Sequence, residues 1–450
     1  MKGGFFMERK IIQVEDKVPF SLMAPLSLQH MFAMFGASVL VPFLFGINPA
    51  VVLLMNGIGT LLFILITKGK APAYLGSSFA FIAPVITLIE KYGQDLGYSY
   101  ALGGFVAVGL FGILLSLIIY KFGADWINVV LPPAAMGPVV ALIGLELAGT
   151  AANTAGLFQN VSYTLIKGTH TYQQVVTPVD PRNVIVFAIT LGTAVFGNVL
   201  FKKFLAVVPI LIAIIAGYIS AICVGIVSFE KVIAAPLFSI PNFSTPKFSA
   251  EAILMILPVL LVITSEHIGH QIVTSEIIGK DLIKDPGLHR SLFADYFSTT
   301  LSGLIGSVPT TTYGENIGVM AVTKVYSVRV IGGAAVLSII CSFVGKLSEL
   351  ISTIPGPVIG GISFLLYGMI GASGIRIMVD ARLNYGKSRN LTLTSVVFVT
   401  GLSGVAVHFG GIELKGMVLA CVAGMLLSLL FYIFDRMGIT NDREEPDQVS

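Results

Sequence analysis

Apolar segments of membrane-spanning length recur along the whole chain. A helix that crosses the hydrocarbon core of a bilayer needs about 17 to 25 mostly hydrophobic residues, and fourteen segments fit this pattern. We therefore expect an all-α polytopic membrane protein with fourteen transmembrane spans. The spans are expected to centre near Phe35, Leu61, Ile82, Leu110, Leu142, Thr190, Ile214, Val259, Leu301, Met320, Leu337, Phe364, Val397 and Met425.

The third and tenth of these segments are weak, because small and polar residues interrupt them. The third contains YLGSSFAFIAP and the tenth contains TTTYGENIGVM. Interrupted membrane helices are typical of the binding sites of transporters built from inverted repeats. A Pro-x-x-x-x-Gly pattern opens an apolar segment at 132–137 and again at 355–360, nearly half the chain later. We therefore expect two inverted seven-span repeats.

The Lys and Arg residues between the spans predict the orientation of the chain. With the amino terminus placed in the cytoplasm, twenty of the 27 basic residues lie on the cytoplasmic side and seven on the outside. Cytoplasmic loops of membrane proteins carry such an excess. We expect a multi-pass protein of the cell (cytoplasmic) membrane, surrounded by lipid, with both termini in the cytoplasm.

The composition mainly excludes classes of protein and of site. The chain is 55% hydrophobic and only 11% charged, whereas a soluble domain carries about 25% charged residues. The formal net charge of +3 comes from basic residues spread along the chain, so we expect no nucleic-acid partner. The three cysteines lie in apolar segments, which argues against a disulfide framework or a cysteine metal site.

Two carboxylates in apolar segments are the strongest functional candidates. Glu266 lies in LLVITSEHIGHQIV, and Glu315 lies in TTTYGENIGVMAVTK. An ionised side chain at mid-bilayer costs about 2.5 to 3.5 kcal/mol, so such residues usually face a cavity, a partner or a substrate. His270 follows Glu266 by four residues and shares its helix face. These three side chains are therefore candidates for binding a polar solute and for carrying a proton.

The string EHIGH invites comparison with the zinc motif His-Glu-x-x-His, but its histidines are three apart and its acid precedes both. With no third ligand evident, we expect no metal and no other cofactor. His267 lies on a different helix face from the candidate carboxylate, and we expect it to hydrogen-bond to a neighbouring helix. A helix contact is also the favoured role of Glu146 and Asp295, whereas Gln29 and His30 are candidates to reach the site.

Backbone N–H groups freed by the two interruptions are candidate donors to the carbonyl oxygens of a solute. Phe79 and Gly314 are the natural donor positions. The alternative is that the small residues at 76–78 and Gly314 only allow helices to pack closely. Tyr313 and Tyr367 are candidates for a cavity wall, although tyrosines in spans are more often packing or interface residues.

The segment ENIGVMAVTK resembles the signature of the nucleobase-ascorbate transporter family, also called nucleobase:cation symporter-2. In that signature an acidic, amide or Pro position precedes Asn-x-Gly-x-x-x-x-Thr and a basic or small residue, and Asn316, Gly318, Thr323 and Lys324 fit it. The resemblance covers nearly the whole chain and is strongest to bacterial members that carry uracil. It runs through PLSLQHMFAMFGASVLVPFLFGINPA, GKAPAYLGSSFAFIAP, LPPAAMG, SEHIGH, DPGLHRS, TTYGENIGVMAVTKVYS and LLYGMIGASGIR.

The resemblance implies an architecture. Family members divide two inverted seven-span repeats between a core domain and a gate domain, have a short β-strand before a half-helix in the third and tenth spans, and are often dimers through the gate domain. The implied boundaries are a cytoplasmic lead-in at 1–18, core segments at 19–120 and 250–346, gate segments at 121–228 and 347–436, an extracellular loop at 229–249 and a cytoplasmic tail at 437–450.

The resemblance also implies site residues. A glutamate at 315 points to a pyrimidine, because xanthine and urate carriers typically have Gln there and ascorbate carriers Pro. The ninth span departs from the family pattern with the bulky Tyr296 and Phe297, which puts local helix packing in question. The implied substrate-binding residues are Glu266, Glu315, Phe79, Gly314, Tyr313 and Tyr367, and the implied proton-coupling residues are His270, Glu266 and Glu315.

We therefore expect a secondary active transporter, not an enzyme, that imports uracil by proton symport as the core moves against the gate. The chemistry agrees, because the two ring N–H groups of uracil need acceptors and its two carbonyls need donors. A purine (xanthine) permease and an anion carrier or channel of similar fold are the alternatives, and an acidic site disfavours the anion. A membrane hydrolase would need a nucleophile or metal arrangement, and coupling to sodium stays open.

Overall fold

The computed structural model describes residues 11–165, 172–202, 205–206, 208–409 and 412–440. Helices make up most of this part of the chain, and each of the fourteen expected span centres lies in a helix. Residues 1–10 of the expected lead-in and 441–450 of the expected tail lie outside the described residues. The chain divides into two compact units: unit 1 comprises Met1–Phe81, Leu88–Gly123 and Pro236–Ser348, and unit 2 comprises Ile82–Thr87, Ala124–Ala235 and Glu349–Ser450.

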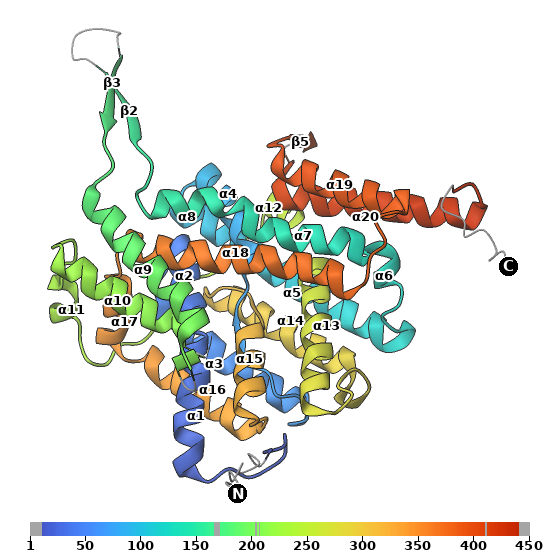
Figure 1. Cartoon of the computed structure of the whole chain (residues 1–450), viewed down its shortest axis with the longest axis horizontal. Helices are drawn as coiled ribbons and strands as arrows, with labels where there is room; N and C mark the ends of the chain where they lie inside the picture. Colours follow the sequence, from blue (N-terminus) through green and yellow to red (C-terminus); the bar gives the residue numbers. More distant parts are fainter. Residues whose placement is uncertain (1–10, 166–171, 203–204, 207, 410–411, 441–450) are drawn as a thin grey trace, which may run out of the picture. The chain divides into compact units, whose positions relative to one another are not determined.

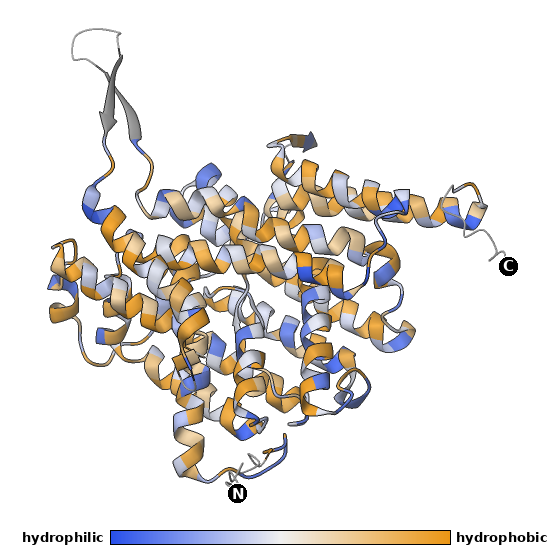
Figure 2. Ribbon diagram, in the orientation of Figure 1, coloured by the Kyte–Doolittle hydropathy of each residue, from blue (hydrophilic) through white to orange (hydrophobic). Residues whose placement is uncertain are grey.

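Eight helical segments of the described chain have the length and apolar composition to cross a membrane. Figure 2 shows hydrophobic residues along most of the helical ribbons. Two further apolar helices, Pro209–Cys223 and Val328–Ser342, are shorter. The eight segments are Phe20–Phe45, Pro49–Ile66, Gln94–Phe122, Pro133–Thr154, Pro181–Leu200, Ala250–Ile278, Gly356–Asp380 and Gly416–Met437.

Unit 1 combines long helices with one two-stranded sheet (Figure 1). Helix α5 packs against α14, and α16 packs against both α1 and α3. The elements are α1 (Phe20–Ala33), α2 (Phe35–Phe45), α3 (Pro49–Ile66), β1 (Leu75–Ser77), η1 (Phe79–Phe81), α5 (Gln94–Phe122), α12 (Ala250–Ile256), α13 (Val259–Ile278), η3 (Ile283–Gly287), α14 (Leu288–Ile305), β4 (Thr310–Thr312), α15 (Gly314–Thr323) and α16 (Val328–Ser342).

The sheet of unit 1 joins the two interrupted segments. Strands β1 and β4 are antiparallel, and Leu75 pairs with Thr312 while Ser77 pairs with Thr310. Both strands are fully buried. Hydroxyl groups serve the remaining backbone groups, since Thr60 Oγ1 accepts from the Leu75 amide at 2.9 Å and Thr299 Oγ1 donates to the Thr310 carbonyl at 2.9 Å. The pairing holds η1 and the start of α15 next to each other in unit 1.

The bulky residues of the expected ninth span have a packing role. The ring of Tyr296 on α14 lies against Gly112 on α5, where an added Cβ would come within 2.1 Å of ring atoms. Its hydroxyl donates to the Leu260 carbonyl at 2.8 Å and lies 2.5 Å from Thr264 Oγ1. The absence of a side chain at Gly112 therefore makes the space that the larger ring fills, and the hydroxyl ties α14 to α13.

The residues just before α1 form a strap across the ends of α13 and α15. Ile12 pairs with Val325, directly after α15, and Val14 is fully buried in the apolar cluster of unit 1. Glu15 forms an ion pair of 2.7 Å with Lys280, directly after α13. Both charged side chains are exposed, so this pair contributes only about 0 to 1 kcal/mol, and burial of Val14 is the larger contribution.

Unit 2 is also mainly helical, with two β-hairpins (Figure 1). Helix α4 (Ile82–Tyr92) and helix α17 (Gly345–Ser352) contain residues of both units. The other elements are α6 (Ile127–Val130), α7 (Pro133–Glu146), α8 (Ala148–Thr154), β2 (Asn160–Leu165), β3 (Tyr172–Thr177), α9 (Pro181–Leu200), α10 (Pro209–Cys223), α11 (Glu230–Ala234), α18 (Gly356–Asp380), α19 (Ser388–Leu402), β5 (Ala406–Phe409), β6 (Ile412–Lys415) and α20 (Gly416–Met437).

Helices α7 and α18 of unit 2 pack backbone to backbone through glycines. A Cβ on Gly144 would lie 2.0 Å from the carbonyl oxygen of Tyr367. Such close approach is a feature of helix pairs in membranes, where small residues replace the hydrophobic drive of water. At the end of α7, Glu146 Oε2 accepts from the Met417 amide at 3.0 Å and thereby caps α20. Glu146 is thus a satisfied helix contact, as expected.

Replacing Gly374 by Val should lower thermal stability, whereas Gly368→Val on the same helix should leave it nearly unchanged. A Cβ on Gly374 would lie 2.3 Å from the Ala141 amide nitrogen, but one on Gly368 meets no heavy atom within 4 Å. Overpacking against a backbone costs about 1 to 3 kcal/mol or more. Melting temperatures in detergent, followed by gel filtration after heating, measure the difference. Equal values for the two variants would contradict the close packing of α7 and α18.

Candidate functional site

The two candidate carboxylates lie in unit 1 on helices that pack together, Glu266 on α13 and Glu315 in the first turn of α15. Both side chains are half-buried, as is His270. The sequence prediction that these separate segments meet is therefore consistent with the geometry of unit 1.

Gly314 lies directly beside the candidate histidine. A Cβ placed on Gly314 would be 3.4 Å from His270 Nε2, and no other heavy atom lies within 4 Å of it apart from residues 313–315 and the nearby backbone of α15. Gly314 itself is exposed, as are Gly269 on α13 and Gly318 on α15. The facing surfaces of α13 and α15 are therefore open around His270, and a small solute could approach the backbone there.

The amino-terminal end of α15 carries backbone N–H groups that have no partner within the helix. The residue before α15, Tyr313, makes no side-chain cap. Instead its hydroxyl donates to the Ser77 carbonyl at 3.2 Å. The Tyr313 side chain therefore does not cap α15, while the Glu315 carboxylate accepts from its own backbone N–H. The partial positive charge of this helix end favours an oxygen acceptor.

Phe79 follows strand β1 of the strand pair. It opens the short helix η1, is half-buried, and its ring centroid is 6.1 Å from that of Tyr313. Close helix packing and exposure of backbone donors are the two roles considered for the small residues of the interruptions. A Cβ on Gly76 would lie 1.7 Å from Met34 Cε, so Gly76 serves close packing, whereas Gly314 does not.

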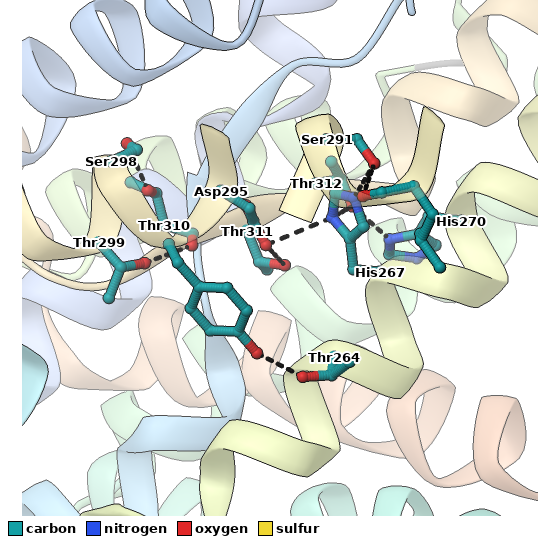
Figure 3. A network of polar contacts seen from close by, with 12 residues as sticks. Thr264, His267, His270, Ser291, Asp295, Ser298, Thr299, Thr310, Thr311 and Thr312 are labelled. Carbon is teal, nitrogen blue, oxygen red and sulfur yellow. Dashed lines mark hydrogen bonds and ion pairs between the residues drawn. The ribbon is translucent and has the colours of Figure 1, made fainter. Parts of the chain in front are cut away.

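His267 is fully buried behind the candidate site and makes polar contacts with α14 and β4 (Figure 3). Its Nε2 lies 2.9 Å from Ser291 Oγ, and its Nδ1 lies 3.3 Å from Asp295 Oδ2. Thr312 Oγ1 lies between the two histidines, 3.4 Å from His267 Nδ1 and 3.1 Å from His270 Nδ1. The expected hydrogen bond of His267 to a neighbouring helix is present.

Sequence reasoning missed the partner of Asp295, which it treated as standing alone. A signal existed, because four polar residues of α14 recur at helical spacing and define one face. This face is buried, so its polar groups need partners, and β4 and α13 supply several of them. The residues of the face are Ser291, Asp295, Ser298 and Ser302.

His30 and Asn316 form a second buried contact, between α1 and α15. Asn316 Nδ2 donates to His30 Nδ1 at 3.0 Å and to the His30 carbonyl at 3.1 Å. Gln29 is also buried on α1. Asn316 belongs to the motif that carried the family resemblance, and its contact with α1 gives this motif residue a structural role.

Tyr367 belongs to unit 2, where it is buried on α18. Cys223 is exposed, Cys341 is half-buried and Cys421 is buried. Within the described residues, no group of three or more His, Cys, Asp or Glu side chains is arranged to hold a metal ion.

Half-buried carboxylates beside two interrupted segments, in a chain of apolar helices, define a membrane transport protein. Comparison with known sequences gives its family: the chain belongs to the Permease family, whose sequence pattern matches residues 22–410. The family resemblance inferred from the 315–324 motif is thereby confirmed. The protein is an integral membrane permease, a transporter and not an enzyme.

Several curated relatives match over nearly their full length. The chain is 53% identical over 444 residues to the uracil permease of Escherichia coli strain K12, covering 98% of this chain and 99% of that one. It is 52% identical over 436 residues to the uracil permease of Paenibacillus larvae, covering 97% and 100%. For the uracil permease of Bacillus subtilis the identity is 45% over 420 residues, covering 92% and 93%.

Solved structures show the same fold at low sequence identity. The murine Slc26a9 anion transporter in its inward-facing state matches with a TM-score of 0.70 at 10% identity, covering 94% of this chain and 69% of that one. The transmembrane domain of the cyanobacterial bicarbonate transporter BicA matches with a TM-score of 0.58 at 16% identity, covering 95% and 100%. The described architecture is therefore a transporter fold.

In a double-mutant cycle, Asn316→Ala and His30→Ala should show an interaction energy of about 1 kcal/mol. Either substitution alone removes the buried hydrogen bond between the two side chains, so the second substitution cannot remove it again. Unfolding free energies in detergent measure this interaction energy. The pair His30→Ala and Thr323→Ala is the control and should be additive, since Thr323 Oγ1 donates to the Val319 carbonyl and accepts from the Val325 amide, neither of which belongs to α1. Additivity in both pairs would contradict an energetic link between α1 and α15.

Proposed function

We propose that this permease imports uracil across the cell membrane by proton symport, with Glu266 and Glu315 as the acceptors for the base. The observation that carries the proposal is the pair of half-buried carboxylates beside the uncapped start of α15. Relatives named uracil permease, 45 to 53% identical over nearly the whole chain, support the choice of substrate.

The chemistry of uracil complements this set of groups. Its two ring N–H groups need acceptors, and carboxylates form strong charge-assisted hydrogen bonds. Its two carbonyl oxygens need donors, for which we assign the backbone N–H groups of Phe79 and Gly314. Tyr313 lies beside them. Cytosine should be rejected, because its amino group and unprotonated N3 would face the wrong partners.

Coupling to protons follows from the same residues. Glu266, Glu315 and His270 are the candidate carriers of the coupled proton, and one charge moving inward gains about 2.3 kcal/mol per 100 mV of membrane potential. Proton and uracil bind from the outside, and loss of the proton on the inside releases the base. Sodium coupling would need an inward sodium gradient and a set of oxygen ligands that coordinate the ion.

For the architecture, we propose fourteen spans in two inverted repeats, with both termini in the cytoplasm and strands β1 and β4 within the third and tenth spans. The core domain comprises 19–120 and 250–346, and the gate domain comprises 121–228 and 347–436. The boundaries of units 1 and 2, near residues 123, 235 and 348, support this division. Transport occurs by alternating access as the core moves against the gate, where Tyr367 forms a wall and a second subunit docks.

An anion carrier is the second candidate, because Slc26a9 and BicA, whose folds are similar to that of this chain, are an anion transporter and a bicarbonate transporter. Two acidic side chains at the site would repel an anion, which favours a neutral base. A purine such as xanthine is the third candidate, and its larger ring system has to fit beside the same carboxylates.

Uptake of labelled uracil into proteoliposomes under an inward proton gradient should be lost in Glu266→Gln and Glu315→Gln. Each substitution removes a charge-assisted hydrogen bond, so binding should weaken by about tenfold to a hundredfold. Glu276→Gln, at an exposed position of the same helix α13, is the matched control and should retain uptake.

Competition and gradient collapse complete the test. Excess unlabelled uracil should abolish uptake, whereas cytosine and xanthine should not. Uptake that persists after the proton gradient and membrane potential are collapsed would exclude proton coupling. Accumulation of xanthine or bicarbonate without uracil would replace the proposed substrate.

A further inference from the structure

The contacts of the polar network behind the site restrict where its protons can lie (Figure 3). It begins with Ser291 on α14, whose hydroxyl donates to the Leu288 carbonyl at 3.0 Å. A hydroxyl has a single proton. Ser291 Oγ must therefore act as acceptor in its 2.9 Å contact with His267 Nε2, and this nitrogen carries a proton.

The other ring nitrogen of His267 is occupied as well. His267 Nδ1 lies 3.3 Å from Asp295 Oδ2, and both side chains are buried. A carboxylate oxygen and a ring nitrogen attract each other only when one proton lies between them, whichever of the two atoms holds it. Thr311 Oγ1 donates to the same carboxylate oxygen at 3.3 Å. His267 Nδ1 therefore has no lone pair left for another donor.

Thr312 now has one place for its proton. Its hydroxyl lies 3.4 Å from His267 Nδ1 and 3.1 Å from His270 Nδ1. Since the first nitrogen is already committed to Asp295, the hydroxyl donates to the second. His270 Nδ1 is then an acceptor without a proton, and a neutral imidazole in that state carries its proton on Nε2.

The protonated nitrogen faces the open part of the site. His270 Nε2 is the atom that a Cβ on Gly314 would approach at 3.4 Å, and apart from residues 313–315 and the nearby backbone of α15 no other heavy atom lies within 4 Å of that point. The N–H group of His270 is thus presented next to the backbone of Gly314, where a carbonyl oxygen of a bound base would find a donor.

We propose that Asp295, His267 and Thr312 are positioning residues that hold His270 with Nδ1 as acceptor and Nε2–H as donor toward a carbonyl oxygen of the nucleobase. The inference rests on the proposed function for the identity of the base, but the state of the imidazole does not depend on it. Asp295 acts on the substrate through three intervening side chains, those of His267, Thr312 and His270.

The state of the imidazole can be read without any substrate. Protein labelled with ¹⁵N at histidine, in lipid nanodiscs, reports by NMR which ring nitrogen carries the proton, and a His270→Gln sample assigns the signals. The wild type should show His270 protonated at Nε2 and bare at Nδ1. Thr312→Ser keeps the hydroxyl and should preserve this pattern, whereas the nearly isosteric Thr312→Val should lose it.

Asp295→Ala tests the remote part of the network. Without the carboxylate, His267 Nδ1 regains a free lone pair and competes for the Thr312 proton, so His270 should shift toward a mixture of tautomers. Gel filtration identifies folded samples, and Thr312→Val and Asp295→Ala are independent routes to the same result. A proton on His270 Nδ1 in the wild type, or an unchanged pattern in both folded variants, would overturn the proposal.

Substrate analogues test the donor role. The affinities of uracil, 2-thiouracil and 4-thiouracil are compared by calorimetry, because sulfur accepts hydrogen bonds more weakly than oxygen. One of the two analogues should bind wild type and Thr312→Ser about tenfold more weakly than uracil, and this preference should shrink in Thr312→Val, where only the backbone donors of Phe79 and Gly314 remain. A preference of unchanged size in Thr312→Val would refute donation by His270.

The two readouts separate the possible failures. The expected NMR pattern in a protein that does not bind uracil would refute the proposed substrate and leave the arrangement of protons intact. Uracil binding combined with a proton on His270 Nδ1 would refute the positioning role and leave the proposed function intact.

Discussion

The hydrogen bonds between β1 and β4 are the constraint on which the candidate site of unit 1 depends. Two segments that are interrupted as helices leave backbone N–H and C=O groups without partners, and such groups are tolerated at membrane depth only where protein satisfies them. The strand pair does this for Leu75–Ser77 and Thr310–Thr312, with Thr60 and Thr299 completing the set. Because the pairing fixes the register, it also fixes where α15 begins, and hence where Gly314 and Glu315 lie relative to α13.

The buried polar face of α14 stabilises this arrangement from behind. Ser298 accepts from the Thr310 hydroxyl at 2.7 Å, and Asp295 accepts from the Thr311 hydroxyl. Burying these groups without partners would cost about 1 to 3 kcal/mol each, so the network also penalises a shifted register of β4. The contacts that hold the strand are the same ones that orient His267. Structure and proposed proton arrangement therefore cannot be changed independently, which is why conservative substitutions such as Thr312→Ser and Thr312→Val are informative.

The comparisons separate fold from chemistry. Slc26a9 and BicA share the fold at 10 to 16% identity, whereas the uracil permeases share about half of all residues. A fold can host unrelated substrates, because substrate choice depends on the few groups at the site. In the proposed site those groups are carboxylates and a histidine, which suit a base with N–H donors and suit an anion poorly. The Permease family, and not the fold, therefore supports the proposed substrate.

The sequence by itself predicted the helices, the two interruptions, the candidate carboxylates and the family, because hydrophobic runs and local motifs are properties of neighbouring residues. It also predicted that His267 contacts a neighbouring helix. It did not reveal that the partner on that helix is Asp295, that Asn316 meets His30, or that Gly76 packs while Gly314 stays open. Each of these depends on segments far apart in the chain, brought together by the β1–β4 register and helix packing. Only the tertiary structure decided them, because a side chain's hydrogen-bond partners are set by distance and direction in space, which no spacing along the sequence contains.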